Sequence, residues 1–100
     1  METVSLKLVT VVAEAVLADS LIDTLKGLGA SGYTLTEVRG EGSRGRRVGE
    51  LPGDNVRVEV LVTPAVAGQI LECISATLFP NYAVVAWTTD VHVVRGEKYA

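Results

Sequence analysis

The chain has 100 residues, which is enough for one small domain with a two-layer core. Hydrophobic residues make up 48% of the chain and charged residues 21%, a composition typical of a folded domain and not of a disordered one. The net charge of −3 argues against a general nucleic-acid-binding protein, because such proteins normally carry a basic face.

The cysteine content and the first residues of the chain indicate the cellular compartment in which the protein is expected. Cys73 is the single cysteine, so an internal disulfide and a Cys-x-x-Cys metal or redox site are both excluded, and a reducing environment is indicated. The first residues lack the pattern of a secretory signal, and no apolar run approaches the roughly 18 residues of a membrane span. We therefore expect a soluble, cytoplasmic protein without membrane insertion.

The first half of the chain predicts a strand, a helix and a second strand. Residues 4–12 alternate between apolar and polar positions and are rich in valine, which favours a strand. Residues 13–28 carry leucines at the spacing of an amphipathic helix, and Gly29 follows where a left-handed cap is needed. The run "YTLTEVR" at 33–39 is rich in strand-forming residues.

The second half repeats this order. Four valines alternate with other residues in "VRVEVLV", which gives the clearest strand pattern of the chain. Thr63 and Pro64 predict a helix start, because threonine caps helices and proline suits the first helical position. The expected elements are a strand over 56–62, a helix over 64–78, a strand over 83–94 and a short tail over 96–100.

The order strand, helix, strand, strand, helix, strand predicts an α+β domain over residues 1–100. It is the order of the ferredoxin-like βαββαβ fold, an antiparallel sheet with both helices on one face. We expect the other face to be partly polar and partly apolar, with Ser5, Lys7, Arg57 and Glu59 beside residues such as Val85, Trp87, Val91 and Val93. Because a bare apolar face of that size is unusual on a monomer, we predict self-association through the sheet.

The segment "RGEGSRGRR" at 39–47 concentrates glycine and arginine. Its Gly-x-Gly-x-x-Gly does not predict a dinucleotide-binding turn, because the following "RRVGELPGDN" has no helical pattern. Glycines do allow backbone N–H groups to surround an anion, and arginines suit phosphate or carboxylate. The loop over 40–54 is long for a small domain, which favours a functional role, although a solvated loop that balances an acidic protein fits the same residues.

Several longer motifs resemble the PII-like family of signal-transduction proteins. The most specific is "GYTLTEVRGEG", followed by "SRGRR", "LPGDNVRVEVLV" and "DVHVVRGEKY", so that the similarity covers essentially the whole chain. The turn in "FPNYAVVAW" and the ending "VVRGEKYA" are more similar to the branch associated with bicarbonate transporters and carboxysomes than to the nitrogen-regulatory branch.

This resemblance implies a homotrimer that binds adenine nucleotides in clefts between subunits and engages a partner through the loop. It implies Thr34 and Leu61 on the adenine side, Gly40 and Gly42 at the base of the loop, and Arg95 offered by the adjoining subunit. The implied phosphate-facing residues are Ser43, Arg44 and either Arg46 or Arg47, with Lys98 as a further candidate.

Several residues depart from the family pattern, and these departures change which ligands are expected. Arg44 stands where the nitrogen-regulatory branch has a glutamine, which puts sensing of 2-oxoglutarate in doubt. Phe79-Pro80-Asn81-Tyr82 replaces a glycine-rich phosphate loop, so AMP or ADP is favoured, with ATP, cyclic AMP and bicarbonate as further candidates. The loop has no tyrosine to modify.

No combination of residues predicts catalysis or metal binding. His92 is the one histidine and more plausibly belongs to the sheet or an interface, while Glu37, Glu41 and Ser43 lack the partners of an acid/base pair or a triad. We therefore expect a regulator that is not an enzyme, needs no obligatory cofactor, and acts on a carbon-uptake or carboxysomal partner. The alternative is a bicarbonate-binding or structural protein without a nucleotide site.

Overall fold

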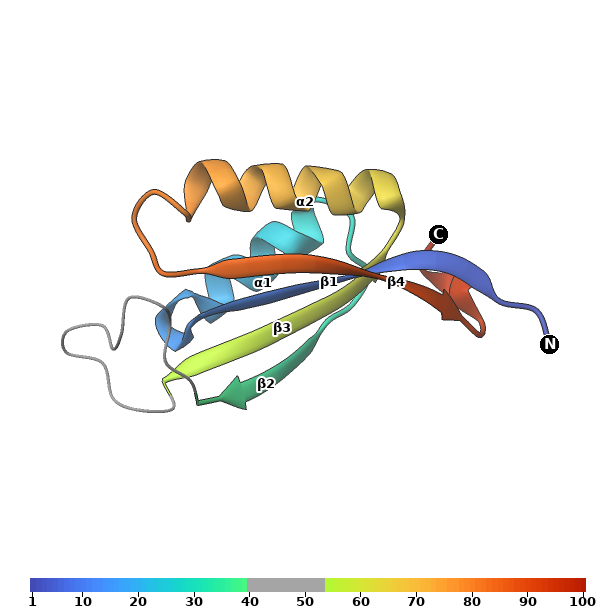
Figure 1. Ribbon diagram of the computed structural model, residues 1–100, viewed down its shortest axis with the longest axis horizontal. Helices are drawn as coiled ribbons and strands as arrows, with labels where there is room; N and C mark the ends of the chain where they lie inside the picture. Colours follow the sequence, from blue (N-terminus) through green and yellow to red (C-terminus); the bar gives the residue numbers. More distant parts are fainter. Residues whose placement is uncertain (40–53) are drawn as a thin grey trace.

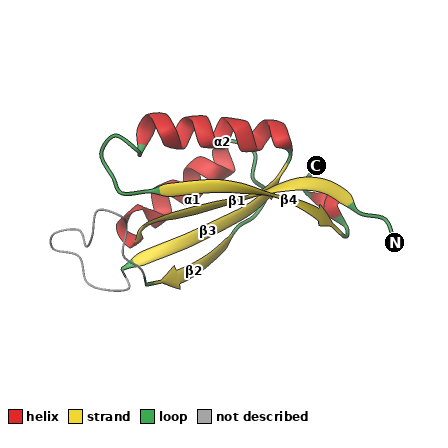
Figure 2. Ribbon diagram, viewed as in Figure 1, coloured by secondary structure: helices red, strands yellow, loops and turns green. Residues whose placement is uncertain are grey.

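The structure, a computed structural model, describes residues 1–39 and 54–100 (Figure 1). Its elements are β1 (Val4–Glu14), η1 (Ala15–Leu17), α1 (Ala18–Gly27), β2 (Thr34–Val38), β3 (Asn55–Val62), α2 (Pro64–Thr77), β4 (Val85–Val93) and η2 (Gly96–Lys98). Figure 2 shows both α-helices on the same side of one sheet. The predicted α+β, ferredoxin-like βαββαβ fold is confirmed.

The sheet has the strand order β2-β3-β1-β4, and each neighbouring pair is antiparallel. The two longest pairings involve β1, which places Val11 opposite Val58 on one side and opposite Ala86 on the other. Because side chains alternate between the faces of a strand, this register decides which residues meet the helices.

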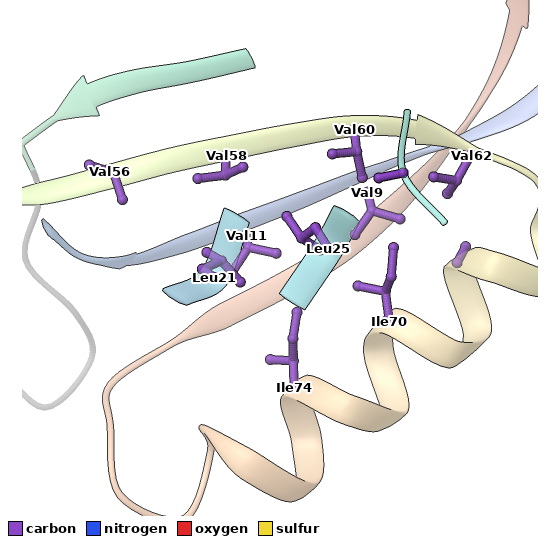
Figure 3. Close-up of a cluster of buried hydrophobic side chains, with 12 residues drawn as sticks. Val9, Val11, Leu21, Leu25, Val56, Val58, Val60, Val62, Ile70 and Ile74 are labelled. Atoms are coloured by element: carbon purple, nitrogen blue, oxygen red, sulfur yellow. The ribbon is translucent and has the colours of Figure 1, made fainter. Parts of the chain in front are cut away.

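The core fills the space between the sheet and the helices (Figure 3). All four valines predicted to alternate on β3 are buried, with exposed fractions of 4% or less. They pack with residues of β1 and of both helices, chiefly Val9, Val11, Leu21, Leu25, Ile70 and Ile74. Complete burial of one such side chain contributes about 1.5–3 kcal/mol, so this face provides the main stabilisation of the fold.

The predicted start of α2 is confirmed in detail. The Thr63 side-chain oxygen accepts a hydrogen bond from the Val66 backbone N–H at 3.4 Å, and Pro64 occupies the first helical position. At the end of α1, Gly29 has a φ of 118°, a left-handed conformation that favours glycine. The Ala30 N–H then bonds to the Leu25 carbonyl, which turns the chain toward β2.

The first helix begins later than the leucine spacing predicts. Residues 13 and 14 continue β1, where they pair with Val56 and Asn55, and α1 begins only at Ala18. The physical reason is that Ala13 is 1% exposed as the next core-facing position of the strand, so pairing and burial outweigh its helical propensity.

The face of the sheet opposite the helices is here named the open face. Its residues include Thr34, Thr36 and Val38 of β2, Asn55, Arg57, Glu59 and Leu61 of β3, Leu6, Leu8, Thr10 and Val12 of β1, and Val85, Trp87, Thr89 and Val91 of β4. The expectation that Ser5 and Lys7 belong to this face is wrong. Lys7 pairs with Val62, so both side chains point to the helix side, where β1 runs past the start of α2.

Candidate functional site

Thr34 and Leu61, the two residues expected on the adenine side, lie on the open face. They belong to the neighbouring strands β2 and β3, and Thr34 is directly opposite Glu59, two positions before Leu61. Thr34 is exposed and Leu61 is half-buried. The structure therefore brings this expected pair together on one surface that a ligand can reach.

Glu59 places a carboxylate beside that pair. Its Oε2 accepts a hydrogen bond from the Thr10 hydroxyl at 2.9 Å, and its Oε1 lies 3.8 Å from the Arg57 Nε. The Glu59 side chain is 26% exposed and that of Arg57 is 45% exposed, so solvent screens the ion pair and it contributes under about 1 kcal/mol. The hydrogen bond from Thr10, which is 1% exposed, fixes the carboxylate more firmly.

Sequence reasoning missed Glu59 as a candidate site residue. The sequence does contain a pattern that indicates it. The alternation in "VRVEVLV" puts the four valines in the core, and it therefore puts Arg57, Glu59 and Leu61 together on the opposite face. What the alternation could not supply is the register of β2, which sets Thr34 against Glu59 and not against a neighbour.

Across the sheet, the row that begins at Thr34 and Glu59 continues through Thr10 to Trp87. Trp87 is 43% exposed and its neighbour on the same face, Val85, is 52% exposed. Trp87 therefore lies outside the core, on the face where the sequence predicted it. The open face thus combines a polar centre with exposed apolar side chains.

Arg95, expected to be offered to a neighbouring subunit, follows β4 in an unusual backbone conformation. It is the one non-glycine residue among those described with a positive φ, at 62°, and it is exposed. Lys98 is also exposed and lies in η2. Their two cationic side chains therefore stand on the same C-terminal turn.

That turn is far from the strand ends that flank residues 40–53. β4 ends where Val93 pairs with Val4, at the start of β1, whereas Asn55 at the start of β3 pairs with Glu14, at the end of β1. The 11 residues of β1 separate these points by about 30 Å or more, at roughly 3.3 Å per residue. Figure 1 shows the C-terminal turn and the ends flanking that segment at opposite ends of the molecule.

The turn at 79–82 lies at the same end as the start of β3 (Figure 1). Its backbone N–H groups are engaged internally: Phe79 bonds to the Ile74 carbonyl at 3.2 Å, and Asn81 and Tyr82 bond to the Leu78 carbonyl at 3.2 and 2.9 Å. Pro80 has no N–H to donate. The turn therefore has no free backbone donor with which to bind a phosphate.

A second polar cluster lies on the helix side, where β1 and β4 run past α2. Lys7 forms an ion pair with Asp90, and the Ser5 hydroxyl lies 3.3 Å from the His92 Nδ1. The hydrogen bond and charge of Lys7 lower the pKa of Asp90 below its ordinary value, and His92 adds to this. An open cavity of about 310 Å³ adjoins these residues and Pro64. This cluster is separate from the open face.

The remaining predicted site residues, Gly40, Gly42, Ser43, Arg44, Arg46 and Arg47, lie outside the described residues. Within residues 1–39 and 54–100, no group of three or more histidine, cysteine or acidic side chains could hold a metal ion. In the same ranges, no helix is long and apolar enough to cross a membrane.

Comparison with known proteins agrees with the fold. The model of the family described as nitrogen regulatory protein P-II matches residues 6–98. A crystal structure of a PII-like signaling protein from Thermus thermophilus is 51% identical, with a TM-score of 0.87 over 100% of both chains. No curated protein matches this sequence.

Structures of CPII, a nitrogen regulatory PII-like protein from Thiomonas intermedia, are also similar. One, bound to ADP and bicarbonate, is 25% identical over 99% of this chain and 98% of that chain, with a TM-score of 0.86. Another, bound to ADP, AMP and bicarbonate, is 22% identical over 94% of this chain and 100% of that chain, with a TM-score of 0.82.

Proposed function

Because the chain belongs to the nitrogen regulatory protein P-II family, we propose that it is a non-enzymatic signalling regulator that binds an adenine nucleotide between the subunits of a homotrimer. The observation that carries this proposal is the placement of Thr34, Glu59 and Leu61 together on the open face. The similar CPII structures, which hold ADP, AMP and bicarbonate, support the choice of ligand.

Two features favour a site that is shared between copies. Arg95 stands about 30 Å or more from the start of β3, too far for its side chain to meet a phosphate held at that strand end by the same chain. A second copy in a cyclic arrangement would bring its own Arg95 to that end. The exposed Trp87 and Val85 give the open face the apolar surface that such a contact would bury.

The nucleotide's sugar and base would meet different residues. Leu61 and the methyl group of Thr34 offer apolar contact to the adenine ring, as the family resemblance implies. Glu59 can accept hydrogen bonds from ribose hydroxyls, the role that carboxylates have in other nucleotide sites. The Thr10 hydrogen bond holds that acceptor in place before the ligand arrives.

The phosphate end would rest on Ser43, Arg44 and Arg46 or Arg47, with Gly40 and Gly42 allowing close backbone approach and Arg95 or Lys98 reaching in from the adjoining copy. Because the turn at 79–82 has no free backbone donor, the chain has one fewer means of holding a third phosphate. AMP and ADP are therefore favoured over ATP, with cyclic AMP as a further candidate.

Bound phosphate would favour one arrangement of the segment at 40–54, and that arrangement would differ from others in its affinity for a partner. The partner class is a bicarbonate transporter or carboxysomal protein in the cytoplasm, a choice that rests on the resemblance of "FPNYAVVAW" and "VVRGEKYA". Bicarbonate as a second ligand is supported by its presence in the CPII structures.

The test is a calorimetric titration of the pure protein with AMP, ADP, ATP, cyclic AMP and GMP, each with and without bicarbonate. We expect binding to saturate near one adenine nucleotide per chain. AMP or ADP should bind most tightly, and GMP should give no heat of binding. Heat from bicarbonate alone, with each nucleotide silent, would replace this proposal by that of a bicarbonate-binding protein without a nucleotide site.

A further inference from the structure

The backbone around Arg95 is held in a conformation that its side chain does not favour. Arg95 has φ 62° and ψ 30°, the left-handed region in which a residue with a Cβ is disfavoured relative to glycine. Such a residue persists only where the surrounding structure holds it, and these positions concentrate at functional sites. The question is what holds it.

The restraint comes from the next residue. Gly96 is buried, and a Cβ built on it would lie 2.7 Å from the Cβ of Val4 and 3.2 Å from the Cβ of Val93. Real Cβ atoms essentially never approach a neighbour as closely as 2.7 Å. Since the nearest atoms belong to strands β1 and β4 and not to flexible side-chain ends, only glycine fits without a shift of backbone.

Backbone hydrogen bonds within residues 95–99 also restrain the turn. The Lys98 N–H bonds to the Arg95 carbonyl at 3.4 Å, and the Tyr99 N–H bonds to the Gly96 carbonyl at 2.9 Å. η2 packs against the first residues of β1, beside which Figure 1 shows it. The turn is thus fixed between its own hydrogen bonds and the β1–β4 pair.

The turn presents the Arg95 side chain at the surface. Arg95 is exposed, and within the part of the chain that the structure describes its guanidinium makes no ion pair. A purely structural turn at this place would favour glycine or asparagine, which adopt the left-handed region at less cost. The arginine therefore occupies this position at a conformational cost, and its side chain is exposed.

From these observations we infer that Gly96 and Val4 are positioning residues for nucleotide binding: their close contact fixes the turn that aims Arg95 at the phosphate held by an adjoining copy. This inference rests on the proposed function. It adds that the start of β1, far from the start of β3 in its own chain, determines the affinity of a neighbour's site. Neither Gly96 nor Val4 needs to touch the ligand.

The central experiment is a double-mutant cycle read by calorimetry with ADP. Gly96→Ala displaces the turn and weakens ADP binding by about tenfold, the loss expected when one charged hydrogen bond is no longer made. Arg95→Ala has a similar effect. In the double variant the two effects do not add, because the displaced turn has no guanidinium left to misplace.

A size exchange keeps the test independent of folding defects. Val4→Gly combined with Gly96→Ala removes the Cβ of residue 4 with which the new Cβ of residue 96 would clash, and it restores ADP affinity at least in part. Gly68→Ala is the matched control, since a Cβ built on Gly68 meets nothing within 4 Å. Circular dichroism and native mass spectrometry establish that each variant keeps its fold and assembly.

The outcomes separate the two proposals. Wild-type protein that binds no adenine nucleotide overturns the proposed function and this inference with it. Wild-type binding that Arg95→Ala weakens but Gly96→Ala leaves unchanged overturns the positioning role alone. Equal losses from Gly96→Ala with and without Arg95 also overturn it, because they would show that the glycine acts through general destabilisation.

Discussion

The two faces of β3 differ in composition and in what their residues can do. On the helix side, Val56, Val58, Val60 and Val62 are almost entirely buried, whereas on the open face Arg57, Glu59 and Leu61 keep part of their surface in solvent. The alternation of a strand thus buries one set of residues in the core and leaves the other set exposed for the proposed binding site. Substitutions on the two faces should separate the two properties.

The largest expected effect on stability is in the core. Ile70→Ala removes a side chain with no exposed surface, and we expect it to lower the free energy of unfolding by about 2–5 kcal/mol. Chemical denaturation measures this loss. The exposed neighbour on α2 provides the control, since Gln69→Ala should stay within about 0.5 kcal/mol of wild type. Equal losses from the two variants would contradict the assignment of the core.

The next effect is on binding. Arg44→Ala should lower the affinity for ADP by about tenfold or more, because a charged hydrogen bond contributes roughly 1.5–3 kcal/mol. Arg44→Lys keeps the positive charge but loses the planar guanidinium, so its affinity for ADP should lie between those of wild type and Arg44→Ala. Stability should change little in either variant. ADP affinity unchanged by Arg44→Ala, measured by calorimetry, would remove this residue from the site.

A smaller effect is expected at the hydrogen bond that links β1 and β3 on the open face. Thr10→Val keeps the shape of the side chain but removes the hydroxyl that donates to Glu59, and should cost about 1 kcal/mol of stability. Thr10→Ser keeps the donor and serves as the comparison. If valine were as stable as threonine while ADP affinity fell, Thr10 would serve the ligand only.

The smallest effect concerns Asp90, whose pKa Lys7 lowers in the folded chain. A carboxyl with a lowered folded pKa contributes stability above its unfolded pKa of about 3.9, and that contribution is lost as the pH falls through the folded value. Asp90→Asn should therefore make stability slightly less dependent on pH below about pH 4. Lys7→Met should do the same, and the double variant no more. Identical acid unfolding curves for Asp90→Asn and wild type would contradict this pair's contribution.

Periodicity predicted the part of the fold that burial controls. The valines of β3, the helix start at Thr63 and Pro64 and the order of elements all follow from local patterns, and the structure confirms them. The start of α1 did not follow, because Ala13 has helical propensity yet is held in β1 by pairing and burial. Propensity is a local property, whereas strand pairing depends on residues far away in the sequence.

The candidate site could be predicted from the sequence only in part, because its residues come together through strand pairing and not through a local pattern. Thr34 and Leu61 came from a family resemblance, and the register places them on the same face of the sheet. Glu59 was missed because its relation to Thr34 exists only once β2 pairs with β3. The restraint of Gly96 by Val4 joins residues 92 positions apart, and no local pattern of spacing could indicate it.

The most direct test of the central claim, that residues of two copies form one nucleotide site, is a mixing experiment. Arg44→Ala and Arg95→Ala chains are co-expressed in equal amounts, and assemblies that contain both are titrated with ADP. If the site is shared in a cyclic trimer, each assembly that contains both chains has one site with both arginines, so that about one third of its sites bind with wild-type affinity. Two uniformly weak variants whose mixture shows no such sites would contradict the claim.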